Sequence, residues 1–296
     1  MNVNLMGVPM DLGQKRRGVD MGPSALRYAG LEAALSQLGH TVEDLGDVDV
    51  PNPESGAAAV GEKRIQTVAN VCGRIYEEGR RAVESGAFAL FLGGDHSISI
   101  GSVKAAAKDS PGTLGIIWID AHSDFNTPET SPTGNIHGMP VAVMCGEGPD
   151  PLTSVGKGVT VLPENIVQVG IRDVDSEEAV RVRSSNLNVF TMHEIDTLGM
   201  ADVASKTLAL LSNCDRIHVS LDLDSLDPVE APGVGTPVQG GLSYREAHLL
   251  AELLSDSGKV RSLDVVEVNP ILDERNKTAL LAVELVASLM GKKILD

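Results

Sequence analysis

Eight short segments of the chain are rich in valine, isoleucine and leucine, and most of them lack the polar alternation of half-exposed strands. This pattern is typical of parallel strands that are buried on both faces of a sheet. The expected strands are residues 2–8, 41–46, 87–92, 113–119, 165–171, 188–191, 216–222 and 261–267. Helical patterns lie between them, from residue 23 and near 62–84, 97–108, 176–185, 202–212, 244–256 and 276–291. The alternation of strand and helix predicts an open α/β sheet with right-handed crossovers.

No segment of the 296-residue chain reads as a linker between domains. The loop 50–62 lies too close to the start of the chain to bound a domain. The stretch 121–163 is rich in Gly, Pro, Thr and Ser, and a loop of this length in a compact domain is usually functional. We therefore expect one domain, residues 1–296.

The charge and the cysteines narrow the class of protein. A formal net charge of −17 argues against nucleic acid or an anionic membrane as a partner. Cys72, Cys145 and Cys214 are widely spaced and odd in number, which favours reduced thiols in the cytoplasm. The first residues do not resemble a signal peptide, and no window approaches the roughly 18 apolar residues of a membrane helix. We expect a cytoplasmic protein.

Three of the expected strands end in acidic or imidazole side chains. These residues are Asp95, His96, Asp120, His122, Asp124, Asp222 and Asp224. Alternate residues of an extended segment point the same way, and the tips of parallel strands share one edge of the sheet. Clustered carboxylates repel one another unless a cation lies among them. A single acid at a strand end is more often a helix cap, and Gly-Gly-Asp-His alone is a weak signal, but three such clusters together predict a centre for two divalent metal ions.

These clusters resemble the signature motifs of the arginase/agmatinase (ureohydrolase) family. The motifs are Gly93-Gly-Asp-His-Ser97, Asp120-Ala-His-Ser-Asp124 and Ser220-Leu-Asp-Leu-Asp-Ser-Leu-Asp-Pro228. The similarity extends from Gly7-Val-Pro-Met-Asp-Leu-Gly13 to Glu267-Val-Asn-Pro-Ile-Leu-Asp273. The resemblance implies a single-domain, three-layer α/β/α fold around an eight-stranded, mostly parallel sheet, and a site for two Mn²⁺ ions. It also implies a homotrimer or homohexamer.

The resemblance also assigns the metal ligands. One ion would contact His96, Asp120, Asp124 and Asp222, and the other Asp120, His122, Asp222 and Asp224. Asp120 and Asp222 would bridge the two ions. Ser225 stands where the family usually has glycine; because serine is small, we expect a local adjustment and retained metal binding. The residues do not distinguish Mn²⁺ from Co²⁺, Fe²⁺ or Ni²⁺.

The loop 126–138 resembles the form found in family members that recognise the α-carboxylate of arginine. The implied substrate-binding residues are Asn126, Thr133 and Asn135 for the carboxylate, Asp175 and Glu178 for the α-amino group, and Glu267 for the guanidinium. By composition alone, 126–135 reads as an ordinary turn-rich loop. The pair Glu177-Glu178 reads equally well as the solvated start of a helix.

The expected reaction is hydrolysis of L-arginine to L-ornithine and urea by a hydroxide that bridges the two metal ions. Asp124 would position the hydroxide and accept its proton, Glu267 would orient the guanidinium, and His137 would transfer protons. Three alternatives stay open at this point. They are a ureohydrolase for agmatine, guanidinobutyrate or formiminoglutamate, a metal-dependent deacetylase of the same fold, and a catalytically silent paralogue that binds metal or guanidino compounds.

Overall fold

The computed structural model describes residues 1–51, 62–108 and 113–295. It contains one sheet of eight strands in the order β2-β1-β3-β8-β7-β4-β5-β6, and every neighbouring pair is parallel. The strands are β1 (Asn2–Val8), β2 (Thr41–Asp47), β3 (Phe88–Gly93), β4 (Leu114–Ile119), β5 (Ile166–Ile171), β6 (Asn188–Thr191), β7 (Arg216–Asp222) and β8 (Val260–Val266). The predicted eight-stranded sheet is confirmed.

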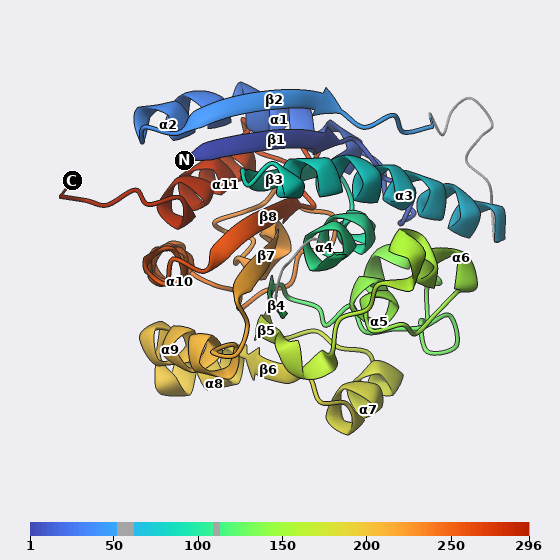
Figure 1. Ribbon diagram of the computed structural model, residues 1–296. Helices are drawn as coiled ribbons and strands as arrows, with labels where there is room; N and C mark the ends of the chain where they lie inside the picture. The colour runs from blue at the N-terminus through green and yellow to red at the C-terminus, as the bar shows by residue number, and fades with distance from the viewer. Residues whose placement is uncertain (52–61, 109–112, 296) are drawn as a thin grey trace.

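Helices cover both faces of the sheet and make three layers (Figure 1). One layer holds α1 (Gly22–Tyr28), α2 (Leu31–Gln37), α8 (Met192–Leu198), α9 (Met200–Leu210), α10 (Tyr244–Asp256) and α11 (Lys277–Leu289). The other holds α3 (Glu62–Glu84), α4 (Ser99–Lys108), α5 (Pro140–Met144), α6 (Asp150–Thr153) and α7 (Ser176–Ser184). The predicted three-layer α/β/α class is confirmed.

The central strands explain why the sequence shows unbroken apolar runs. In β3, Phe88, Leu90 and Leu92 pack against the layer of α10 and α11, whereas Ala89 and Phe91 pack against that of α3. Successive side chains of a strand point to opposite faces, so both sets must be apolar when both faces are covered. The resulting central strands are rigid supports whose carboxyl ends all lie on one edge.

Some predicted boundaries differ from the structure. The strand predicted over 261–267 ends at Val266, because Glu267 takes a left-handed backbone conformation with φ 63° and leaves the sheet. The helix predicted over 97–108 begins as the 3-10 turn η3 (His96–Ile98) and becomes α-helical from Ser99. Most of the loop predicted over 50–62 lies outside the described residues. In the described ranges, no helix combines the length and apolarity needed to span a bilayer.

Candidate metal centre and substrate pocket

The predicted metal ligands converge at the carboxyl edge of the sheet, where β3, β4 and β7 end. His96 opens η3 directly after β3, and the D-x-H-x-D cluster follows β4. Asp222 is the last residue of β7, and Asp224 lies in the 3-10 turn η7 (Leu223–Ser225). The four aspartates and His96 are buried, and His122 is partly exposed to the pocket. Strand order thus brings together side chains that are more than 100 residues apart.

His96 faces three carboxylates. Its Nδ1 atom lies 3.0 Å from Asp120 Oδ2, 3.3 Å from Asp124 Oδ2 and 3.1 Å from Asp222 Oδ2. This buried nitrogen has no hydrogen-bond partner among the described residues. An imidazole nitrogen and carboxylate oxygens directed at one point suit a divalent cation such as Mn²⁺.

A second ligand set adjoins the first and shares Asp120 with it. His122 Nδ1 lies 3.4 Å from Asp120 Oδ1 and 3.2 Å from Asp224 Oδ2. The two oxygens of Asp120 therefore face different histidines. Asp222 Oδ2 faces His96, and its Oδ1 accepts the amide of Asp224 at 2.8 Å. The side chains fit two neighbouring cations.

Groups around the ligands hold them in place. Trp118 stacks on His96 with ring centroids 3.9 Å apart, and its Nε1 donates to Asp120 Oδ2 at 2.9 Å. Thr236 donates to Asp224 Oδ2 at 2.7 Å. The hydroxyl of Ser225 donates to the carbonyl of Asp222 at 2.6 Å, so serine fits at this position without an unpaired polar atom. Such contacts fix the orientation of ligating side chains.

The electrostatics of the cluster favour proton uptake when no cation is present. Burial, and then the charge of Asp120, raise the pKa of Asp124 well above its ordinary value. Burial, and then the charges of Asp224 and Asp120, raise the pKa of Asp222 in the same direction. Burial alone would lower the pKa of His122, but the charges and hydrogen bonds of Asp224 and Asp120 raise it. Metal binding must therefore displace protons from this cluster.

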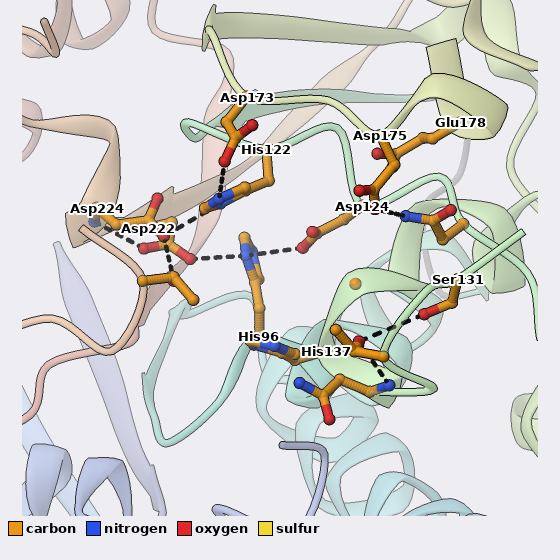
Figure 2. A pocket seen from close by; sticks show the side chains of 15 residues that line it. His96, His122, Asp124, Ser131, His137, Asp173, Asp175, Glu178, Asp222 and Asp224 are labelled. Atoms are coloured by element: carbon orange, nitrogen blue, oxygen red, sulfur yellow. Dashed lines mark hydrogen bonds and ion pairs between the residues drawn. The ribbon is translucent and has the colours of Figure 1, made fainter. Parts of the chain in front are cut away.

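A cavity of about 170 Å³ opens above the ligands (Figure 2). In Figure 2, His122, Asp222 and Asp224 lie on one side of it, and Asp175, Glu178 and Ser131 lie on the other. The predicted substrate residues that line it are Asn126, Thr133, Asn135, Asp175 and Glu178. The lining also includes Ser131, Asp173 and Thr236, which the sequence analysis did not select.

The predicted carboxylate loop presents Asn126 in a fixed orientation. Thr130 Oγ1 donates to Asn126 Oδ1 at 2.9 Å, and Asn126 Nδ2 donates to Asp175 Oδ2 at 3.2 Å. Glu178, which is 3% exposed, accepts the amide of Phe125 at 2.7 Å. Burial raises the pKa of Glu178 to about 7. The loop and the start of α7 therefore form one bonded wall of the pocket.

His137 and Glu267 form a hydrogen-bonded pair at the edge of the cavity. His137 lines it, but Glu267 is 1% exposed and does not. Glu267 Oε1 lies 2.9 Å from His137 Nδ1 and accepts the amide of His96 at 3.1 Å, while Oε2 accepts Gln14 Nε2 at 2.9 Å. Burial lowers the pKa of His137, but the hydrogen bond and charge of Glu267 outweigh it and raise the pKa to about 9. His137 is therefore protonated at neutral pH.

Two residues of the site have left-handed backbones although they are not glycine. Asp124 has φ 51° and Glu267 has φ 63°. Such conformations cost about 1–3 kcal/mol each and persist only where the surroundings impose them. Their occurrence at two predicted catalytic positions supports a functional site.

Arg172 ties the site together and was not selected from the sequence. Its guanidinium donates to the carbonyls of Asp224 at 2.7 Å, Ser225 at 3.0 Å and Val238 at 2.8 Å. Arg172 follows β5, so these bonds connect the end of β5 to the turn after β7 that carries Asp224. Its position three residues before the predicted Asp175 was a signal, and Gln14 directly follows the motif Gly7–Gly13, whereas Thr236 lies in a loop with no local pattern.

Comparisons with known proteins agree with this geometry. A family model described as "Arginase family" matches residues 1–291. The arginase of Bacillus subtilis strain 168 is 52% identical over 294 residues, which cover 99% of both chains. A crystal structure of Bacillus subtilis arginase has a TM-score of 0.92 at 50% identity and covers 100% of both chains. A structure of Entamoeba histolytica arginase in complex with L-ornithine has a TM-score of 0.91 at 31% identity and covers 98% of both chains.

Proposed function

The chain belongs to the arginase family, and from this premise we propose that it hydrolyses L-arginine to L-ornithine and urea at a centre of two Mn²⁺ ions. The observation that carries the proposal is the placement of Asp120, whose two oxygens face two adjoining histidine–carboxylate sets beneath a polar pocket. All six positions to which the family resemblance assigns a ligand carry His or Asp. This completeness argues against a silent paralogue.

The ligand sets follow the family's assignment, and the distances bring together all of their members except Asp222 with the second set. His96, Asp120, Asp124 and Asp222 would hold one ion, and Asp120, His122, Asp222 and Asp224 the other. Asp120 would contact both ions, and the family's assignment gives Asp222 the same role. Two bound divalent cations lower the pKa of a water between them and so supply hydroxide near neutral pH.

The pocket residues would bind the two ends of the substrate. Asn126, Thr133 and Asn135 would recognise the α-carboxylate, while Asp175 and Glu178 would recognise the α-amino group. Agmatine lacks the carboxylate, so it would leave these polar groups of the loop unpaired. The wall from Asn126 to Asp175 is already bonded in place, which reduces the entropy cost of recognition.

Three residues would act on the guanidinium. Asp124 would orient the attacking oxygen and accept its proton. Glu267 would hold the guanidinium in line; because it lies behind the lining, this role requires its side chain or that of His137 to shift when substrate binds. His137, held protonated by Glu267, would donate a proton to the leaving nitrogen as the carbon–nitrogen bond breaks.

We also propose the domain organisation, the cellular location, the class of partner and the oligomeric state of the enzyme. Residues 1–296 would form one catalytic domain, because the single sheet takes strands from both halves of the chain. The three cysteines are free, which fits a cytoplasmic location. The net charge of −17 fits a small-molecule substrate better than nucleic acid or an anionic membrane. A homotrimer or homohexamer is proposed from the family alone.

The test compares kcat/KM for L-arginine and agmatine by urea release, on protein stripped of metal and reloaded with Mn²⁺. We expect arginine to be preferred by about 10³-fold. This is below the 10⁴–10⁵ of fully buried polar recognition, because water reaches Thr133 and Asn135 in this loop. Preference for agmatine would keep the metal centre and overturn the role of the loop. If neither compound is hydrolysed, the chain would instead be a catalytically silent paralogue.

Replacing His137 with asparagine is expected to lower kcat by about 10²-fold, because the leaving nitrogen loses its proton donor. The Mn²⁺ content should not change, since the side-chain hydrogen bond of His137 goes to Glu267, which is not a proposed ligand. Urea release and metal analysis of the same preparation check both statements. Loss of metal in this variant would show that His137 supports the centre and does not act on the substrate.

A further inference from the structure

A buried chain of polar side chains runs from the metal centre to β8. His96 Nε2 lies 2.8 Å from Ser220 Oγ, and Ser220 Oγ lies 3.2 Å from Ser99 Oγ. Ser99 Oγ donates to Asp264 Oδ2 at 2.6 Å. Ser99, Ser220 and Asp264 are each 0% exposed, and none of them lines the pocket. The chain therefore lies beneath the site and touches no substrate.

The carboxylate at the end of this chain determines the direction of every hydrogen bond in it. An ionised carboxylate only accepts, so the hydroxyl hydrogen of Ser99 is committed to Asp264. Ser99 Oγ can then only accept from Ser220, whose hydroxyl hydrogen is committed in turn. Ser220 Oγ is left to accept from His96, which places a hydrogen on Nε2.

Asp264 has the surroundings that this argument requires. Burial raises its pKa, but the charge of His218 and the hydrogen bonds of His218, Ser99 and Ser102 lower it below the ordinary value. His218 Nε2 lies 3.2 Å from Asp264 Oδ2 and is also fully buried. The carboxyl group is thus ionised at neutral pH, although it is enclosed.

We propose that Asp264, acting through Ser99 and Ser220, is a positioning residue that keeps the Nε2 hydrogen on His96 and holds Nδ1 toward the metal centre. The proposal rests on the proposed function for the identity of that centre. The hydrogen on Nε2 leaves Nδ1 free as the electron-pair donor that a cation needs, and three carboxylates already face this atom. Partners of this kind typically contribute 10–100-fold to metal affinity.

Ser102 provides a matched control. Its hydroxyl donates to the same Asp264 oxygen at 2.8 Å, and it is also 0% exposed. No bond connects it to Ser220 or His96 in the described part of the chain. Ser99→Ala and Ser102→Ala each remove one buried hydroxyl and one bond to Asp264, but only Ser99→Ala interrupts the chain.

The experiment measures the Mn²⁺ dissociation constants of the full chain, from the electron paramagnetic resonance of free Mn²⁺, together with Tm of the metal-free protein. Ser99→Ala is expected to raise the Mn²⁺ dissociation constant of one of the two sites by 10–100-fold. In Ser102→Ala, both dissociation constants should stay within about threefold of the parent values. Both variants should lower Tm similarly. Equal weakening by the two variants, or none by either, would overturn the proposal and leave a purely structural network.

A spectroscopic measurement covers the case in which Ser99→Ala folds poorly. With diamagnetic Zn²⁺ bound, the nitrogen-15 spectrum of the parent should show a slowly exchanging Nε2 proton on His96. Asp264→Asn, which can donate as well as accept, should lose that signal or speed its exchange. An unprotonated Nε2 in the parent would refute the proposal outright. Because these readouts are metal binding and protonation, failure to hydrolyse arginine would overturn the proposed function and leave them unaffected.

Discussion

Replacing Asp124 with asparagine is expected to lower kcat for L-arginine by about 10⁴-fold, at the upper end of what one acid–base group contributes. Asparagine keeps the shape of the side chain and tolerates the left-handed backbone at φ 51°. It removes the charge that faces His96 Nδ1 at 3.3 Å and the group that would accept the proton of the attacking oxygen. The loss should therefore be chemical, with the fold retained. Urea release, circular dichroism and Tm on one preparation check this expectation.

Asp227→Asn is the control for the loss of a carboxylate in the same region. Asp227 lies within the third motif, but its side chain accepts the backbone amides of Val229, Gly240 and Gly241 and does not line the pocket. Its amide oxygen can keep part of these bonds, so kcat should stay within about threefold of the parent. Near-normal turnover in Asp124→Asn would refute the assignment of Asp124. A comparable loss in both variants would assign the effect to the loop.

Removing the metal with a chelator is expected to abolish urea release and to lower Tm. Ions that bind only the folded chain stabilise it by about 2.7 kcal/mol at 100 times their Kd, which corresponds to roughly 5–10 °C for a chain of this size. The reason is local: without cations, the buried Asp124 and Asp222 are forced together and take up protons. Calorimetric unfolding before and after chelation measures the shift. Full activity in metal-free protein would overturn the whole assignment.

The same protons also predict how Mn²⁺ affinity depends on pH. The metal-free pKa values of Asp124 and Asp222 are raised, so each ion must displace protons that these groups hold at acidic pH. Mn²⁺ affinity should therefore fall as the pH is lowered, and binding should release protons. Titration calorimetry in two buffers of different ionisation enthalpy measures the number released. Reloading with Mn²⁺, Co²⁺, Fe²⁺ and Ni²⁺ in turn ranks the ions by affinity. The ligand types alone do not give this ranking.

The sheet could be predicted because strands covered on both faces leave continuous apolar runs, such as 87–92 and 114–119. The short helices α5 and α6, of five and four residues, could not, because they span too little chain for a 3.6-residue period to emerge. They lie within the stretch 121–163, which was expected as one functional loop. The end of β8 was misplaced by one residue, because φ at Glu267 is imposed by its tertiary partners.

Part of the candidate site could likewise be predicted from the sequence, and part of it could not. The convergence of the candidate metal ligands could be predicted because the clusters directly follow buried parallel strands, whose carboxyl ends lie on one edge of the sheet. Thr236 and Gln14 could not, since each reaches the site from an isolated loop position. The chain from Ser99 to Asp264 spans 165 residues and depends on the register of β7 and β8, which no local pattern encodes. Contacts that depend on strand register or on isolated loop residues therefore could not be predicted.

The left-handed backbones at Asp124 and Glu267 have a consequence for anyone who engineers this protein. Glycine at either position would relieve the strain, so a screen that scores only the heat resistance or expression of the metal-free protein would favour glycine there. Such a screen would remove a proposed metal ligand and the carboxylate that keeps His137 protonated. Laboratory evolution toward durability should therefore hold these two positions constant, or it will select inert proteins with higher melting temperatures.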